Sequence, residues 1–166
     1  MSISAIIIIV MAKKKQSGLQ RIKKITNKRA RFDYDLGDSF VAGLSLTGAE
    51  TKALRMGHGH LRGSYVTVNN NELYLLNATI TGFKGVKLDE TEQTRTRKLL
   101  MKRREIDALI EQKNQGKSII PTELLTGGRY IKLRLGVGVG RKKYDKRELI
   151  KKRDTQRNQA VELRNK

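Results

Sequence analysis

The chain has no cysteine and only two histidines among its 166 residues, and these shortages exclude several kinds of chemistry. Without cysteine there is no disulfide scaffold, no thiol nucleophile and no cysteine-based zinc site. His58 and His60 lie two residues apart in a glycine-rich stretch, and no third metal ligand is evident. The sequence therefore offers almost no candidate residue for acid–base or nucleophilic catalysis by histidine. We expect a protein that is not an enzyme and that needs no metal or cofactor.

Acidic residues are also scarce, because 16 Asp and Glu face 36 Lys and Arg, which gives a formal net charge of +20. Such an excess repels itself in a compact state and is usually kept for a polyanionic partner. Nucleic acid is the favoured partner. An anionic membrane surface and an acidic protein stay open as alternatives.

Long apolar runs are missing apart from Ile6–Val10, near the start of the chain. This run is much shorter than the about 20 apolar residues that a membrane-spanning helix needs. It also lacks the preceding basic residues and the following cleavage site of a signal peptide. Residues 11–15 (MAKKK) are more typical of the start of a protein than residues 1–10. We therefore expect residues 1–10 to be a mis-assigned or disordered extension. We expect a cytoplasmic protein with no membrane partner, monomeric when free.

Charge and apolar content divide the chain into three parts. Residues 1–26 consist of the extension and a basic arm that has few apolar residues, and this composition predicts disorder. Residues 27–140 carry the apolar periodicity of one folded domain. Residues 141–166 form a basic tail with good helix propensity but no continuous apolar stripe that could dock on a core. We expect this tail to be disordered when free and helical when bound.

The apolar residues of the middle part alternate over many short segments, which is typical of β-strands. We expect strands from Arg31 to Leu46, at 64–68 and 72–77 around a turn at Asn69–Asn71, and at 119–121 and 129–139. Helical spacing predicts helices at about 48–56 and at 95–114, and residues 83–94 are expected to form a mobile loop. The fold class is α+β, mainly β with two or three helices. Short strands with glycine turns favour a small closed antiparallel barrel of the five-stranded oligonucleotide-binding type.

The segment Gly136–Gly140 alternates glycine with valine and looks like a phosphate loop. A P-loop has four residues between its glycines, followed by Lys and Ser or Thr, whereas Arg141 follows here. A bending strand or a hinge is the better interpretation. Asp89, Glu90 and Glu92 lack the spacing of metal ligands.

Basic residues interleaved with aromatic ones remain as the candidate functional feature. In the strand at 129–139, Lys132 and Arg134 alternate with apolar residues, which predicts an apolar inner face and a basic outer face. Cationic side chains neutralise phosphates, and aromatic rings stack on the unpaired bases that RNA offers in loops and bends. Tyr34, Tyr130 and Tyr144 each lie near basic residues; for Tyr34 and Tyr130 a place in the core is the competing interpretation.

Several sequence blocks, in their order and spacing, resemble those of the SsrA-binding protein family, also called small protein B. The blocks are 27–34 (NKRARFDY), 40–43 (FVAG), 46–57 (LTGAETKALRMG), 64–66 (SYV), 94–100 (TRTRKLL) and 144–147 (YDKR). The resemblance covers about residues 27–153. Three positions depart from the family pattern: Val41 replaces a common acid, Val139 a frequent lysine, and Gln93 the usual proline.

The resemblance implies an oligonucleotide-binding-type barrel that grips the tRNA-like part of transfer-messenger RNA in ribosome rescue. It also implies that the tail enters the vacant mRNA path of a stalled ribosome and becomes helical near the decoding centre. The RNA-binding residues it implies are Asn27, Lys28, Arg29, Tyr34, Lys52, Arg55, Arg95, Arg97 and Lys98, to which the strand pattern adds Lys132 and Arg134. The implied decoding-centre residues are Gly140, Arg141, Lys142, Lys143, Tyr144, Asp145, Lys146 and Arg147.

Two other functions compete with ribosome rescue. A generic ribosomal or translation-factor RNA-binding protein would use the same charge, but it has no need of the tail block. A nucleic-acid-processing enzyme would need clustered carboxylates or a catalytic histidine, and neither is visible in the sequence.

Overall fold

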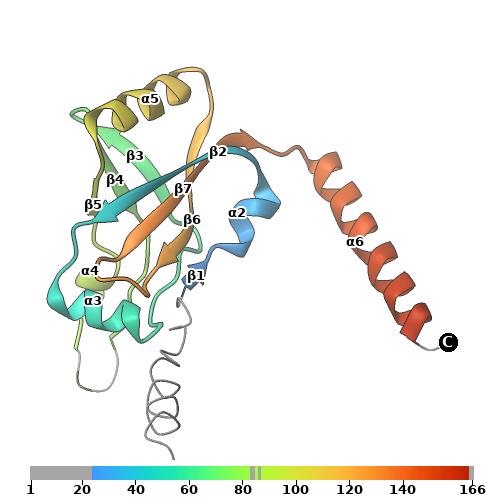
Figure 1. Ribbon diagram of the computed structural model, residues 1–166, viewed down its shortest axis with the longest axis horizontal. Coiled ribbons are helices and arrows are strands. Elements are labelled where there is room, and N and C mark those ends of the chain that lie inside the picture. The colour runs from blue at the N-terminus through green and yellow to red at the C-terminus, as the bar shows by residue number, and fades with distance from the viewer. Residues whose placement is uncertain (1–23, 83–84, 86, 165–166) are drawn as a thin grey trace, which may run out of the picture.

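The computed structural model describes residues 24–82, 85 and 87–164. This part of the chain forms seven strands and five helices, and their labels follow Figure 1. They are β1 (Lys24–Thr26), α2 (Lys28–Asp33), β2 (Tyr34–Leu44), α3 (Gly48–Arg55), β3 (Tyr65–Asn69), β4 (Glu72–Leu76), α4 (Glu90–Gln93), β5 (Arg97–Leu100), α5 (Arg103–Asn114), β6 (Ser118–Leu125), β7 (Lys132–Gly140) and α6 (Lys143–Arg164). The α+β fold class is confirmed.

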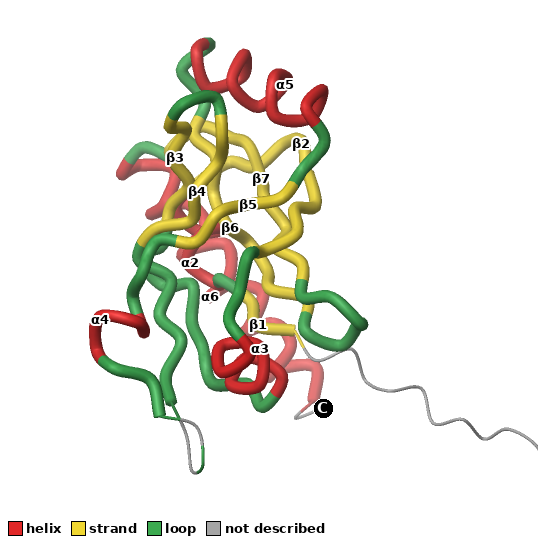
Figure 2. The backbone as a smooth tube through the Cα atoms, turned by 90° about the vertical axis from the view of Figure 1, so that its left-hand side faces the viewer, coloured by secondary structure: helices red, strands yellow, loops and turns green. Residues whose placement is uncertain are grey.

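The strands form one antiparallel sheet in the order β1-β6-β7-β2-β5-β4-β3. β2 is the longest strand; it pairs with β7 over most of its length and with β5 at its end. The sheet curls strongly, with α5 across one end and α3 at the other (Figures 1 and 2). Among the described residues the edge strands β1 and β3 do not pair with each other, so the expected closed five-stranded barrel is wrong.

The core fills the inside of the curled sheet. Leu73 and Leu75 of β4 and Leu133 and Leu135 of β7 are buried, as the alternating pattern predicts for strands with one solvated face. α5 adds Ile106 and Leu109, and α3 adds Ala53 and Leu54. The hairpin predicted at Asn69–Asn71 is confirmed, because Asn70 and Asn71 both adopt the left-handed backbone that such a turn needs.

The predicted helix over 95–114 is wrong in its first half, because β5 occupies Arg97–Leu100 and α5 begins only at Arg103. In β5 the side chains of Arg97 and Leu99 are buried while Lys98 and Leu100 are exposed, which is a period of two. The strand is only four residues long, and its charged residues hide this period from a search for apolar residues.

Two boundaries near the start of the fold also need correction. Residues 28–33 form α2 and not a strand from Arg31, because the Asn27 side chain caps a short helix by accepting a hydrogen bond from the Ala30 N–H. The domain boundary expected at residue 27 lies too late, since Lys24–Thr26 pairs with β6. Residues 1–23, with the extension and most of the basic arm, lie outside the described residues.

The glycines of β7 are needed because β2 passes very close to it. A Cβ atom at Gly138 would collide with the backbone carbonyl of Asp35, and one at Gly136 would press on Leu36 and Thr122. The interpretation of this segment as a strand is confirmed, and its resemblance to a phosphate loop is superficial. In the segment expected to be a mobile loop, Glu90–Gln93 forms the short helix α4.

The tail forms the 22-residue helix α6, which projects away from the sheet (Figure 1). Those of its side chains whose burial the structure describes are almost all exposed, as the lack of an apolar stripe predicts. Whether the helix melts when the protein is free remains a prediction.

Candidate nucleic-acid interface

The outer surface of β2, β5 and β7 combines cationic and apolar side chains. Because Leu133 and Leu135 point into the core, Lys132 and Arg134 project to the opposite side. Strand pairing places Arg134 opposite Val41, and it places Gly43 between Lys132 and Leu100. Lys98 shares the outer side of β5 with Leu100. We call these six residues the sheet face; they are Val41, Gly43, Lys98, Leu100, Lys132 and Arg134.

The centre of the sheet face is apolar. Val41 and Leu100 remain 43% and 54% exposed, although both are large aliphatic residues. Gly43 has no side chain to fill the space between Lys132 and Leu100, and a Cβ atom there would lie 3.3 Å from that of Leu100. Such a surface can contact ribose and base while the surrounding cations pair with phosphates.

Two of the three cations of the sheet face, Lys98 and Arg134, are paired with carboxylates. Glu72 accepts a hydrogen bond from Lys98, which raises the pKa of that ammonium and keeps it charged. Glu123 is nearly buried and lies near three cations at once: Arg134 at 2.8 Å, Lys24 at 3.6 Å and Arg31 at 3.7 Å. One carboxylate against three cations leaves this cluster with a net positive charge.

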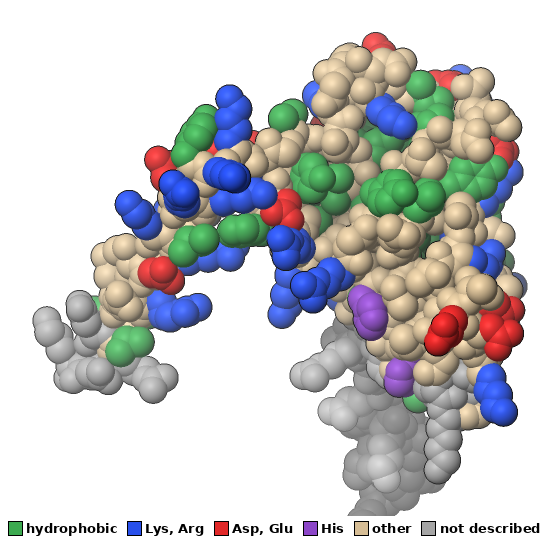
Figure 3. Space-filling model, turned by 180° about the vertical axis from the view of Figure 1, so that it is seen from behind, with side chains coloured by type: hydrophobic (Ala, Val, Ile, Leu, Met, Phe, Trp, Pro, Cys, Tyr) green, Lys and Arg blue, Asp and Glu red, His purple; other side chains and the backbone are tan. Residues whose placement is uncertain are grey.

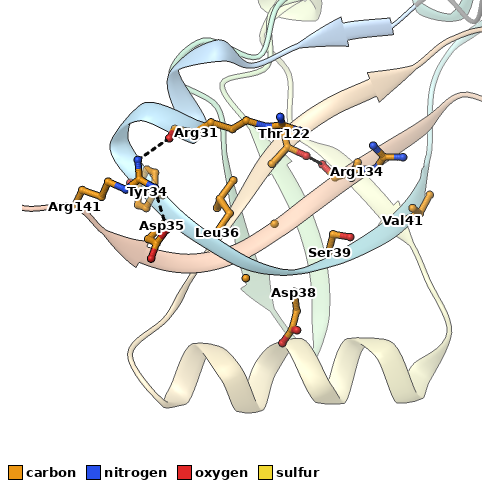
Figure 4. Close-up of a pocket in the computed structure, with 12 residues that line it drawn as sticks. Arg31, Tyr34, Asp35, Leu36, Asp38, Ser39, Val41, Thr122, Arg134 and Arg141 are labelled. Carbon is orange, nitrogen blue, oxygen red and sulfur yellow. Dashed lines mark hydrogen bonds and ion pairs between the residues drawn. The ribbon is translucent and has the colours of Figure 1, made fainter. Parts of the chain in front are cut away.

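A cavity of about 510 Å³ lies beside this cluster, between β2, α2 and β7 (Figure 4). Arg31, Arg134 and Arg141 project around it (Figure 4), and its lining also includes Gly37 and Gly136, which have no side chains. Tyr34 also lines this cavity. It is half-buried, so its burial favours neither the core role nor the stacking role that the sequence left open. The arginines extend the positive surface from the sheet face toward α6.

Arg97 does not belong to this surface, so its prediction as an RNA contact is wrong. Its side chain is fully buried, and all five guanidinium N–H groups donate to the protein itself. One bond goes to the Glu50 carboxylate at 2.9 Å, and the others go to backbone carbonyls at Ala78, Glu92, Gln93 and Arg95. Arg97 therefore joins α3 to β5 and leaves no donor for a phosphate.

Glu50 is the buried carboxylate at the centre of this network. Arg95 donates to both of its oxygens, at 2.8 and 2.6 Å, and Arg97 donates to one. Burial alone would raise the pKa of Glu50, but the hydrogen bonds from Arg95 and the Thr47 N–H and the charge of Arg97 outweigh it and lower that pKa. Burial lowers the pKa of Arg97 in turn. Of the three charged side chains Glu50, Arg95 and Arg97, only that of Arg95 is partly exposed to solvent.

The remaining predicted RNA-binding residues also divide into a buried structural residue and exposed surface residues. Asn27 is buried, and its side-chain amide donates to the carbonyls of Leu61 and Pro121, so it holds α2 in place. Lys28, Arg29 and Lys52 are exposed, although Arg29 also pairs with Asp33. Exposed Arg55 donates to the backbone carbonyl of Arg129 in the β6–β7 hairpin.

The tail residues begin where α2, β2 and β7 meet. The Arg141 N–H donates to the Asp33 carbonyl, and the Arg141 guanidinium pairs with Asp35 at 2.9 Å. Lys146 donates to the Asp33 carboxylate at 2.7 Å, a bond that lowers the pKa of Asp33 against the effect of burial. The Asp145 carboxylate accepts from the Lys142 N–H at the start of α6, and Tyr144 is 59% exposed. Figure 3 shows blue Lys and Arg side chains crowded along α6 and on the part of the body that faces it.

The sequence reasoning missed Leu100 and treated Val41 only as a departure from a family pattern. Both lie on the sheet face because β2 pairs with β7 on one side and with β5 on the other. The alternation of Arg97 and Leu99 with Lys98 and Leu100 was the available signal.

Within the described residues no group of three or more His, Asp or Glu is placed to hold a metal ion. No helix in that same part of the chain is long and apolar enough to cross a membrane.

Comparisons with known proteins agree on one family. The family model described as SmpB protein matches residues 24–165. The SsrA-binding protein of Acholeplasma laidlawii is 40% identical over 141 residues, covering 84% of this chain and 95% of the relative. That of Gloeobacter violaceus is 41% identical over 136 residues, covering 80% and 88%. A solved structure described as "tmRNA-SmpB: a journey to the center of the bacterial ribosome" aligns with a TM-score of 0.61 at 32% identity, covering 72% of this chain and 85% of that one.

Proposed function

The chain belongs to the SmpB protein family, and we propose that it binds the tRNA-like domain of transfer-messenger RNA and delivers it to stalled ribosomes for trans-translation. Its relatives are named for binding SsrA, and the aligned structure is described as tmRNA–SmpB in the bacterial ribosome. The proposal gives the chain a binding role, not a catalytic one, and places it in the cytoplasm with the ribosomes.

The sheet face is the observation that carries this proposal. Lys98, Lys132 and Arg134 project from one outer surface, where they can neutralise neighbouring phosphates and release counterions. Val41 and Leu100 between them offer apolar contact to sugar and base. A rigid sheet with cations already placed suits a folded RNA whose phosphates have fixed positions.

The tail supports the second half of the proposal. A helix of 22 residues is about 33 Å long, enough to reach from an RNA bound at the sheet into a separate channel. Its exposed basic side chains have no core to pack on, so they remain available for ribosomal RNA. We propose that residues 140–147 act at the decoding centre and that the rest of the helix lies in the empty mRNA path.

The first test identifies the RNA that the protein binds in cells. The full chain is purified from cells that contain transfer-messenger RNA, and the bound RNA is sequenced. Transfer-messenger RNA should dominate, and Lys132→Ala should reduce the amount recovered. Lys113→Ala is the matched control, since Lys113 lies on α5 and not on the sheet face. A mixture of ribosomal RNAs in its place would favour a generic ribosomal protein.

The second test separates rescue from RNA binding. A chain that ends at Lys142 keeps β7 and the Arg141 contacts but lacks α6. It should bind transfer-messenger RNA nearly as well as the full chain and yet fail to support tagging of stalled peptides. Tyr144→Ala should show the same separation. Full tagging by the shortened chain would contradict the proposed role of the tail.

A further inference from the structure

Tyr130 lies at the end of the β6–β7 hairpin with its ring in solvent. Its side chain is 68% exposed, whereas the next residue, Ile131, is only 5% exposed. Tyr130 lies in the bend that precedes β7, and both it and Lys132, the first residue of β7, are exposed. The competing interpretation of Tyr130 as a core residue is therefore excluded.

The ring is held in place from one side. The guanidinium carbon of Arg129 lies 5.4 Å from the ring centroid, which is a cation–π contact. The backbone of Arg129 is in turn anchored to α3, because Arg55 donates to its carbonyl at 3.0 Å. The guanidinium lies over one face of the ring, and the 68% exposure of Tyr130 leaves ring surface accessible to a flat ligand.

We propose that Tyr130 is a stacking site for an unpaired nucleobase of the bound RNA, with Arg129 and Lys132 neutralising the phosphates on either side of it. This inference rests on the proposed function. Lys132 belongs to the sheet face as well, so an RNA strand that crosses the sheet face reaches Tyr130 where β7 begins. Stacking on tyrosine tolerates any base, because every base has a π face.

An RNA base suits this site better than an apolar protein segment does. One cation on the exposed ring and a second two residues further along the chain attract a partner that alternates phosphates with flat rings, which is the chemistry of single-stranded RNA. The same cations would cost desolvation against an apolar partner. A fully paired duplex offers phosphates but no free base face, so it distinguishes stacking from charge alone.

The chain has no tryptophan, which makes a direct test possible. Tyr130→Trp introduces one fluorophore at the site, and Tyr65→Trp, on β3, introduces a control fluorophore at another exposed tyrosine. Transfer-messenger RNA should quench the indole at position 130 and leave the one at position 65 unchanged. A paired RNA duplex, added to the same bound fraction, should quench neither. Equal quenching at both positions, or by duplex, would overturn the stacking site.

Affinity gives an independent readout. Tyr130→Ala should weaken binding of transfer-messenger RNA by about 5- to 150-fold, and Tyr130→Phe should restore it, because stacking needs the ring and not the hydroxyl. The loss for Tyr130→Ala should be equal at all salt concentrations, whereas Lys132→Ala should reduce the salt slope by about one. If Tyr130→Ala binds within about two-fold of the parent, the inference fails and the proposed function stands. If the parent chain binds no transfer-messenger RNA, both fail.

Discussion

Replacing Arg97 by methionine tests whether this residue supports the fold or contacts RNA. The substitution keeps an apolar stem of similar length and removes five donors from a fully buried site. Glu50 keeps Arg95 as a partner, but four backbone carbonyls around the site lose the Arg97 donors. Breaking a buried ion pair in this way costs about 3–5 kcal/mol of unfolding free energy.

That loss is a large share of the about 5–15 kcal/mol that holds a domain of this size together. Urea unfolding followed by circular dichroism should show it as a large drop in the midpoint, with the slope unchanged. Arg95→Met, at a partly exposed partner of the same carboxylate, should cost much less, about 1 kcal/mol. Lys98→Met, next to Arg97 on the outer side of β5, is the matched control and should leave stability nearly unchanged.

The contrast between stability and affinity decides the outcome. Under conditions where it is folded, Arg97→Met should bind RNA almost normally, because its guanidinium does not reach the surface. Lys98→Met should do the opposite, with normal unfolding and weaker binding. If Arg97→Met unfolds like the parent and loses RNA affinity, the reasoning from burial is refuted.

Three further predictions follow from the contacts around Glu50 and on the sheet. The pKa of Glu50 is lowered, so the ionised carboxylate stabilises the fold fully above its ordinary pKa of 4.5, and this stabilisation is lost as the pH falls through the pKa of the folded state. As the pH is lowered, the urea midpoint of Glu50→Gln should therefore fall less than that of the parent. Gly138→Ala should cost about 1–3 kcal/mol of unfolding free energy, because its methyl group collides with the backbone of β2, whereas Gly140→Ala should cost little in the same urea series. Leu100→Ser should weaken RNA binding about five-fold in fluorescence anisotropy, if roughly 1 kcal/mol of apolar contact is lost, without a change in stability; Val161→Ser, equally exposed on α6, should leave affinity for isolated RNA unchanged.

Patterns within a few residues were enough to predict part of this fold. The asparagine turn between β3 and β4 and the alternation in β7 are local features, and both are found where the sequence places them. Lys132 and Arg134 could be assigned to an outer face for the same reason, because their apolar neighbours mark the inner one.

Long-range partners explain the failures. Arg97 looks like a surface cation in sequence, and only its partner Glu50, 47 residues away, makes its burial possible. Asn27 looks like a polar contact residue, but its amide is used by carbonyls of Leu61 and Pro121. Closure of the sheet depends on whether β1 and β3 meet, and neither strand carries a signal of that meeting.

The joint between the sheet and α6 determines how one small protein can serve two partners. The joint consists mainly of the ion pairs Lys146–Asp33 and Arg141–Asp35, together with Lys146 beside the Phe32 ring. Ion pairs that remain in contact with water contribute about 1 kcal/mol or less each and weaken with salt, so they orient the helix without locking it. The sheet face, in contrast, is fixed by the buried core beneath it and by the Glu123 cluster. We propose that RNA stays bound to the sheet while ribosomal phosphates compete for Lys146 and Arg141 and redirect the tail.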